Sequence, residues 1–189
     1  MRYLIVCGGK IDKEFGLNEI KTDGIDVIIA ADSGMDFLYE NGVTPDIIVG
    51  DFDSTTTNAL EYFERKGQTE IRKLNPIKDD TDTEYAIRLA ISEGARSIVV
   101  LGATGSRIDH VLGNISLLGI GLESKADISI IDTNNRIRMA DKPVTIEKSA
   151  QYGRFVSLIA VTDDNEVSLR GFKYPVTDYS FDRSTSLGI

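Results

Sequence analysis

The sequence predicts an α/β fold followed by a smaller β domain, and two observations support this. Short apolar runs alternate with helical patterns over the first two-thirds of the 189 residues, which is typical of parallel βα units. After about residue 125 the chain changes to short alternating runs of β type separated by turn sequences. We therefore expect a Rossmann-like, mostly parallel sheet with flanking helices over residues 1–125 and a smaller all-β sandwich over residues 126–189.

The first domain is expected to contain strands at residues 3–7, 26–31, 46–49 and 97–101. Its helices are expected at residues 33–42, 55–66, 81–94 and 109–122. The helix over 81–94 has the clearest limits. Thr81 and Glu84 have the spacing of a capping box, and Gly94 is a typical C-terminal stop.

The second domain is expected to contain β-type runs at residues 127–132, 136–139, 144–147, 155–161 and 166–169. Turn sequences separate them, such as Thr133-Asn134-Asn135 and Thr162-Asp163-Asp164-Asn165. Because the runs are short and follow one another closely, we expect them to pair antiparallel in a sandwich or small barrel.

The charge balance is acidic, with 21 basic and 30 acidic residues and a formal net charge of −9. This balance argues against binding to nucleic acid or to an anionic membrane surface, since both attract an excess of positive charge. No apolar run approaches the roughly 18 residues that a membrane span needs. Cys7 is the single cysteine, which excludes an internal disulfide and fits a reducing compartment. The chain also begins without the pattern of a signal peptide, so we expect a cytoplasmic protein with no membrane or nucleic-acid partner.

Carboxylates gather at two places along the chain. Asp51 and Asp53 follow the strand over 46–49, and three aspartates within residues 79–82 stand at the start of the helix over 81–94. Ligands of open α/β sheets bind at the carboxyl edge of the strands. Gathered carboxylates repel one another unless a cation lies among them, and Mg²⁺ prefers oxygen ligands. The sequence therefore predicts Mg²⁺-dependent phosphate chemistry.

Helix capping is the structural alternative for some of these residues. An N-cap at Asp53 or Ser54 would satisfy free N–H groups of the next helix, and Thr81 with Glu84 is explained by a capping box. One cap needs only one side chain, however, and the acidic residues exceed that number. We therefore interpret Asp82, at the first helical position, as a metal ligand.

A turn containing two glycines follows the strand over 97–101, with the sequence Gly102-Ala-Thr104-Gly105-Ser-Arg107-Ile-Asp109-His110. Backbone N–H groups at such a turn can bind an anion, and Arg107 can hold a phosphate through two hydrogen bonds. An ordinary βα loop is an equally good interpretation of the turn alone. The chain has no Gly-x-x-x-x-Gly-Lys-Ser/Thr motif, so it is not a P-loop protein. His110, the only histidine, is interpreted as structural, because Asp109 beside it is an equally good candidate base.

Five segments form a pattern through their order along the chain. They are Ala31-Asp32-Ser33-Gly34, then Pro45-Asp46-x-x-x-Gly50-Asp51-x-Asp53-Ser54, then Lys78-Asp79-x-Thr81-Asp82-x-Glu84, then Gly102-x-Thr104-Gly105-x-Arg107-x-Asp109-His110-x-x-Gly113-Asn114, then Gly171-Phe172-Lys173-Tyr174-Pro175. In this order they resemble the thiamine pyrophosphokinase family, and the resemblance spans nearly the whole chain. Each motif alone is moderately specific, whereas all five across an α/β half and a β half are highly specific.

The resemblance implies transfer of the pyrophosphoryl group of ATP to the hydroxyl of thiamine, with release of AMP. It implies a homodimer whose thiamine pocket lies between the β domain of one subunit and the catalytic domain of its partner. It implies Mg²⁺ ligands and catalytic residues at Asp51, Asp53, Asp82, Arg107 and Asp109, of which the first three hold the metal. It implies ATP contacts at Asp32, Gly34, Lys78, Thr81, Thr104, Gly105 and Arg107. It also implies an aromatic wall for thiamine at Tyr174 and a closing strand that follows Ile189 in the family.

Three other classes of protein compete with this interpretation. Asp51 and Asp53 resemble the nucleophile strand of a haloacid-dehalogenase-type phosphatase, but the interval before Asp79 is too short for the βα units of that class. An EF-hand begun at Asp51 would need glycine and glutamate where Thr56 and Tyr62 stand. A nucleotide sensor without catalytic activity stays open as the third alternative.

Overall fold

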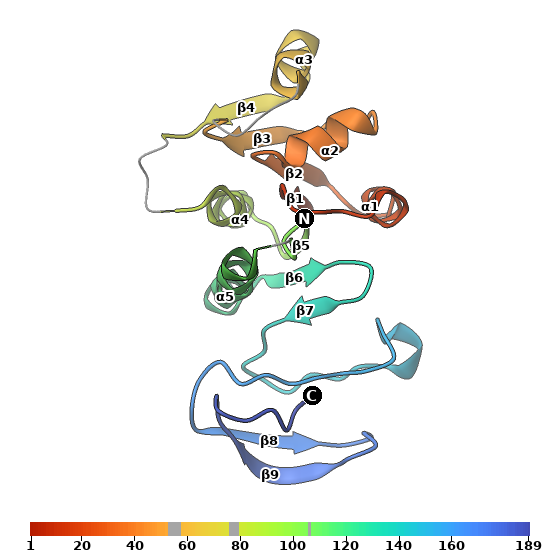
Figure 1. The fold of residues 1–189 in the computed structure, drawn as a ribbon, viewed down its shortest axis with the longest axis vertical. Coiled ribbons are helices and arrows are strands. Elements are labelled where there is room, and N and C mark those ends of the chain that lie inside the picture. Colours follow the sequence, from red (N-terminus) through yellow and green to blue (C-terminus); the bar gives the residue numbers. More distant parts are fainter. Residues whose placement is uncertain (53–57, 76–79, 106) are drawn as a thin grey trace. The chain divides into compact units, whose positions relative to one another are not determined.

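The structure is a computed structural model in which residues 1–52, 58–75, 80–105 and 107–189 are described (Figure 1). The chain forms two compact units, Met1–Glu147 and Lys148–Ile189. Each unit has its own sheet.

A seven-stranded sheet forms the first unit, with its strands in the order β4-β3-β2-β1-β5-β6-β7. The strands are β1 (Arg2–Val6), β2 (Val27–Ala31), β3 (Ile47–Gly50), β4 (Glu70–Lys73), β5 (Ser97–Leu101), β6 (Asp127–Ile131) and β7 (Arg136–Arg138). Neighbours from β4 to β6 pair in parallel, and β7 pairs antiparallel with β6. The expected mostly parallel sheet is therefore confirmed.

Helices cover both faces of this sheet. In the described part of the unit they are α1 (Lys13–Ile20), α2 (Gly34–Glu40), α3 (Ala59–Lys66), α4 (Asp82–Ser92) and α5 (Ile108–Ser124). Successive strand residues point to opposite faces, and this alternation separates two cores. Tyr3 and Ile5 of β1 pack in the core that α4 and α5 cover, while Leu4 and Val6 pack in the core that α2 and α3 cover. Figure 1 shows α4 and α5 on one side of the sheet and α1 and α2 on the other. No helix in the described residues is both long and apolar enough to cross a membrane.

The sequence analysis missed α1 and β4. The β4 strand reads Glu-Ile-Arg-Lys, with one apolar residue, because it lies at the edge of the sheet and pairs only with β3. The α1 helix has eight residues and begins at Asp12, whose side chain accepts a hydrogen bond from the backbone N–H of Phe15 at 2.9 Å. Both elements are short and only partly buried, so their apolar patterns are weak.

The start of α4 agrees with the expected cap. The Thr81 hydroxyl accepts a hydrogen bond from the backbone N–H of Glu84 at 3.2 Å. The Glu84 carboxylate pairs with Arg88 one turn later, at 2.7 Å. Thr81 is thus confirmed as the N-cap, and Asp82 is the first residue of the helix.

The first unit extends further along the chain than residue 125. The runs that became β6 and β7 were expected in the second domain, but β6 pairs in parallel with β5 and β7 pairs with β6. The side chains of β6 are buried on both faces of the sheet, as is typical of a parallel strand, so β6 extends the first sheet. A short turn then leads to β7. The division between the two units lies after Glu147.

The second unit contains a small antiparallel sheet of β8 (Asn165–Leu169) and β9 (Val176–Phe181). The smaller β domain is thus confirmed. The expected runs at 144–147 and 155–161, all described residues, are not in strands. Their apolar side chains are largely exposed, with Phe155 at 80% and Ile159 at 77%, so the unit buries little of its own apolar surface.

Candidate active site

The winding of the first sheet reverses at β1. From β1 the chain adds β2, β3 and β4 on one side and then crosses back to place β5 and β6 on the other. Ligands of open α/β sheets bind at such a switch point, outside the carboxyl ends of the strands. The residues that follow β1, β2, β3 and β5 are therefore candidates for a binding site.

Three carboxylates converge at this edge of the sheet. Asp32 follows β2, Asp51 follows β3, and Asp82 is the first residue of α4. One carboxylate oxygen from each lies within 4.8 Å of the others, and all three residues are half-buried. Charges this close repel strongly in a partly desolvated site. A set of oxygen donors of this kind fits a hard divalent cation such as Mg²⁺, which completes its shell with water and phosphate oxygens.

The backbone turns sharply beside two of these carboxylates. Asp32 has a φ of 48°, and Phe52, directly after Asp51, has a φ of 65°. Residues other than glycine rarely adopt this left-handed conformation, although Asp and Asn tolerate it better than most. Backbone strain is concentrated at functional sites, where the surrounding structure holds it in place. Both β2 and β3 therefore end in strained turns that present a carboxylate at the sheet edge.

The loops after β1, β2 and β5 pack with their backbones in contact. The backbone N–H of Gly9 donates to the carbonyl oxygen of Gly102 at 3.0 Å. A Cβ at Gly9 would lie 2.2 Å from that oxygen, and a Cβ at Gly34 would lie 1.9 Å from the carbonyl oxygen of Val6. Only glycine fits at these two positions. The close approach of the loops is thus built into the sequence.

Two side chains hold the turn over residues 102–105. The Asn114 amide, from α5, donates to the carbonyl oxygen of Ala103 at 2.9 Å. Asp132, which follows β6, is hydrogen-bonded to the side chain of Thr104. Burial raises the pKa of Asp132, but hydrogen bonds from its neighbours, Thr104 among them, outweigh burial and lower the pKa overall. An ionised carboxylate therefore fixes the expected ATP contact Thr104.

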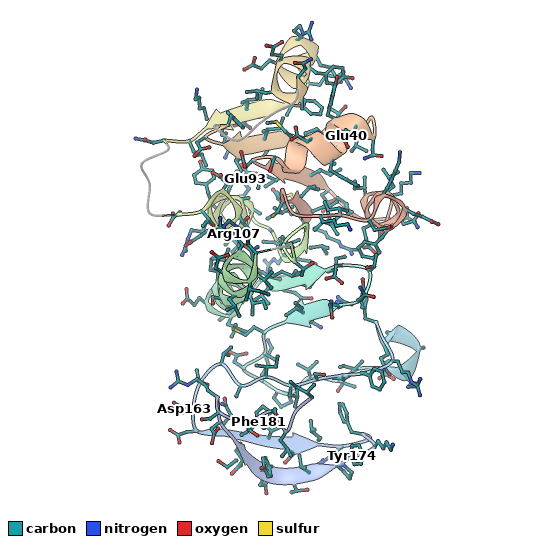
Figure 2. The ribbon with its side chains drawn as sticks, viewed as in Figure 1. Glu40, Glu93, Arg107, Asp163, Tyr174 and Phe181 are labelled. Atoms are coloured by element: carbon teal, nitrogen blue, oxygen red, sulfur yellow. The ribbon has the colours of Figure 1, made fainter. Side chains whose placement is uncertain are left out.

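Arg107 and Asp109 form an ion pair at the start of α5, where Figure 2 labels Arg107. The Nη2 and Oδ2 atoms are 2.6 Å apart, and both side chains are exposed. Hydrogen bonds from Arg107 and from the backbone N–H of His110 lower the pKa of Asp109 to about 2. Asp109 is therefore ionised at neutral pH and a weak base. The guanidinium of Arg107 has the planar donor geometry that phosphate also matches.

Cys7 directly follows β1 and is buried in the core. Its Sγ accepts a hydrogen bond from the Thr83 hydroxyl at 3.4 Å. Burial raises the pKa of the thiol to about 11, so it stays protonated. The contact links β1 to the first turn of α4, which carries Asp82.

The other expected site residues lie in three places. Asp53 and Lys78, expected to bind Mg²⁺ and ATP, lie outside the described residues. Gly105 lies against the loop after β1, where a Cβ on Gly105 would be 3.3 Å from the Cα of Gly9. Tyr174 lies in the second unit, where it is exposed, and Figure 2 labels it there.

The sequence analysis did not place Asp32 in the acidic cluster. The resemblance implies an ATP contact there and no metal ligand. The available signal was the one used for Asp51, namely a carboxylate that directly follows an apolar run. Asn114 and Asp132 could not have been found as supports of the turn over 102–105, since the contacts join separate elements.

Comparison with known families decides which group of proteins this chain resembles. A model of the thiamin pyrophosphokinase catalytic domain matches residues 21–131. A model of the thiamin pyrophosphokinase vitamin B1 binding domain matches residues 143–189. The chain belongs to the thiamine pyrophosphokinase family.

Individual members of the thiamine pyrophosphokinase family agree with this. The chain is 35% identical to a thiamine pyrophosphokinase of Bacillus subtilis (strain 168) over 159 residues, which is 83% of this chain and 73% of that relative. A crystal structure of thiamine pyrophosphokinase from Bacillus subtilis matches with a TM-score of 0.85 at 31% identity, over 100% of this chain and 88% of that one. A thiamin pyrophosphokinase family protein from Enterococcus faecalis matches with a TM-score of 0.73 at 27% identity, over 98% of this chain and 86% of that one. These findings confirm the family and the fold class, and they support the pyrophosphokinase rather than the phosphatase interpretation.

Proposed function

We propose that the chain transfers the pyrophosphoryl group of ATP to the hydroxyl of thiamine, giving thiamine diphosphate and AMP. The observation that carries the proposal is the convergence of Asp32, Asp51 and Asp82 at the switch-point edge of a sheet that belongs to this family. A metal-binding carboxylate cluster at that edge suits a triphosphate substrate.

The reaction forms one bond and breaks another at the same phosphorus atom. The hydroxyl oxygen of thiamine attacks the β-phosphorus, and the bond from that phosphorus to the oxygen bridging the α and β phosphates breaks. The bridging oxygen leaves with AMP, and the hydroxyl proton is released. Negative charge develops on the leaving oxygen, so catalysis depends on positive charge held near it.

We assign the metal and ATP to residues of the first unit. In this assignment Asp32, Asp51 and Asp82, together with Asp53, would hold Mg²⁺. A Mg²⁺ ion bound there would supply positive charge to the phosphate oxygens. Arg107 binds phosphate through its guanidinium in exchange for its contact with Asp109. Before ATP binds, the ionised Asp109 orients Arg107. The remaining ATP contacts are assigned to Gly34, Lys78, Thr81, Thr104 and Gly105.

We assign thiamine to residues of the second unit. The thiazolium ring of thiamine is a cation, and cations are attracted to the face of an aromatic ring. Tyr174 is 74% exposed, and the Lys173 ammonium lies 5.2 Å from the centre of its ring, so this ring face already accepts a cation. The net charge of −9 also favours a cationic substrate.

We further propose that the active form is a homodimer that works in the cytoplasm. The second unit has a two-stranded sheet and exposed large apolar residues such as Phe155 and Ile159. A unit this small gains little stability from its own core, and a second copy would cover the exposed apolar surface. The buried, reduced Cys7 is consistent with a reducing compartment.

The position of a radioactive label tests the proposed reaction. With ATP labelled at the γ-phosphate, we expect all transferred label in thiamine diphosphate and an equal amount of unlabelled AMP. Labelled thiamine monophosphate with ADP would instead identify a simple kinase. Free labelled phosphate formed with or without thiamine would identify a phosphatase, and unchanged ATP would identify a nucleotide sensor.

A further inference from the structure

We infer that Lys10 contacts the phosphates of ATP and is a substrate-binding residue of this site. The inference rests on the proposed function and concerns the loop over residues 7–10, between β1 and α1. The match to the catalytic-domain model begins at residue 21, so it does not include this loop. The structure nevertheless places the loop at the switch point of the sheet, after the central strand β1.

The loop begins beside the acidic cluster. A Cβ at Gly8 would lie 1.9 Å from the hydroxyl oxygen of Ser33, and Ser33 directly follows Asp32. The Sγ of Cys7 lies 3.4 Å from the hydroxyl of Thr83, which directly follows Asp82. The start of the loop therefore contacts the neighbours of two of the three carboxylates.

The loop ends beside the turn over residues 102–105. Gly9 donates its backbone N–H to the carbonyl oxygen of Gly102 at 3.0 Å. A Cβ at Gly105 would lie 3.3 Å from the Cα of Gly9 and 3.9 Å from the backbone nitrogen of Lys10. The loop thus spans from the cation-binding carboxylates to the expected phosphate-binding turn, and Lys10 lies at its far end. A triphosphate whose metal ion was held by these carboxylates would therefore be able to reach Lys10 along this loop.

The charges at the site favour a further cation at that end, in addition to the assigned Lys78 and Arg107. One divalent ion does not neutralise a triphosphate, and three carboxylates of the protein lie close to it. The backbone N–H of Gly9 is already used by Gly102, so within this loop the lysine side chain is the donor that is offered to a phosphate. Lys10 is exposed, and it is in none of the ion pairs formed between the described residues. Its flexible stem and three rotatable donors suit it to bind phosphate as a point charge.

Binding measurements with matched variants test the inference. The probe is a non-cleavable ATP analogue with a methylene group between the α and β phosphates, titrated with Mg²⁺ by calorimetry. We expect Lys10→Gln to weaken binding about tenfold, as for the loss of one charge-assisted contact, and Lys10→Arg to retain most of it. In turnover, the KM for ATP should rise by a similar factor in Lys10→Gln while the KM for thiamine does not change. Lys13→Gln, which removes the same charge from an exposed position on α1, is the control and should bind as the wild type does.

Three outcomes would overturn the inference. Wild-type affinity in Lys10→Gln would show that Lys10 does not contact the phosphates. An equal loss of affinity in Lys13→Gln would show that the effect comes from net charge alone. If the wild-type chain did not bind the analogue, the proposed function would fail as well. If the wild type and Lys10→Gln bound it equally well, only the role of Lys10 would be overturned.

Discussion

At the scale of single residues, the acidic cluster combines electrostatic repulsion with backbone strain. Asp32 has a φ of 48°, and its carboxylate lies within 4.8 Å of those of Asp51 and Asp82. Asn tolerates the left-handed conformation as Asp does, so a change to Asn removes the charge and leaves the backbone preference unchanged. This makes Asn the informative substitution at Asp32, where Ala would add backbone strain.

Asp32→Asn, Asp51→Asn and Asp82→Asn should each lower kcat by at least about 100-fold, because each would remove a negative ligand of the cation that we propose at the reacting phosphates. Without metal, the thermal midpoint of each variant should equal or exceed that of the wild type, since repulsion is relieved. Steady-state kinetics and thermal unfolding in a chelator measure the two effects.

Asp80→Asn is the matched control for these variants, because Asp80 is exposed and stands just before the cap of α4. It should retain wild-type kcat. Adding Mg²⁺ should raise the thermal midpoint of the wild type and of Asp80→Asn but not that of Asp82→Asn. Full activity in all three cluster variants would remove the metal assignment, and a large loss of stability would favour a purely structural role.

The ion pair of Arg107 and Asp109 predicts a pH dependence. The pKa of Asp109 is lowered to about 2 in the folded chain, first by the hydrogen bond from Arg107. A lowered pKa means that the stabilising contribution is present above the unfolded value, near 3.9, and is lost as the pH falls through about 2. If activity falls as the pH is lowered toward 4, protonation of Asp109 should therefore not be the cause. Carboxyl NMR titration should show its pKa returning toward the ordinary value in Arg107→Gln, and an unchanged titration would contradict the assigned cause.

At the scale of elements, the site depends on contacts between loops and on the anchoring of an edge strand. The edge strand β4 carries Arg72, whose Nη2 lies 2.9 Å from Oε1 of Glu93 at the end of α4. The other carboxylate oxygen of Glu93 accepts a hydrogen bond from the Tyr3 hydroxyl of β1 at 3.2 Å, and Figure 2 labels Glu93. These contacts connect a strand with one apolar residue to the centre of the sheet. They explain how β4 is held in place although its own apolar pattern is weak.

Gly34→Ala tests the close packing of the loops. Its Cβ would lie 1.9 Å from the carbonyl oxygen of Val6, so β1 and α2 would have to move apart. We expect the free energy of unfolding to fall by about 1–3 kcal/mol, with a parallel loss of activity because the loop after β1 is displaced. Denaturant unfolding measures the change.

Gly119→Ala is the control for this prediction. Gly119 lies inside α5, and a Cβ there would meet only the sulfur of Met139 at an ordinary 3.8 Å. Alanine favours helix by up to about 1 kcal/mol over glycine, so stability should be equal or higher. Similar losses in both variants would show that the contact with Val6 is not what requires glycine at residue 34.

At the scale of the whole molecule, a net charge of −9 has opposite effects on the two proposed substrates. The field of an acidic protein attracts the thiamine cation and repels the ATP anion. In the proposed site, recognition of ATP therefore depends on cations held there, namely Mg²⁺, Arg107 and Lys10. Raising the ionic strength screens the general repulsion, whereas contacts within the site are screened less.

Sedimentation velocity at micromolar concentration should show a homodimer. Ile159→Asp places a charge on an apolar side chain that is 77% exposed in the single chain, and it should shift the protein toward monomer. Thr177→Asp adds the same charge at an exposed polar position of β9 and should remain dimeric. A fully active wild-type monomer would contradict the proposed assembly.

The sequence alone determined the class of the fold, the four parallel strands β1, β2, β3 and β5 of the first unit, and the family. Apolar periodicity and motifs are properties of short stretches of sequence, and each strand from β1 to β3 is predicted by the apolar run of its own residues. Only the tertiary structure decided that β6 joins the first sheet, that Asp32 joins Asp51 and Asp82, and that the loop over 7–10 lies between them and the turn over 102–105. The physical reason is that strand pairing, and the convergence of side chains at the carboxyl edge of the sheet, bring together residues far apart in the chain. A local sequence pattern does not indicate which loops will meet at that edge.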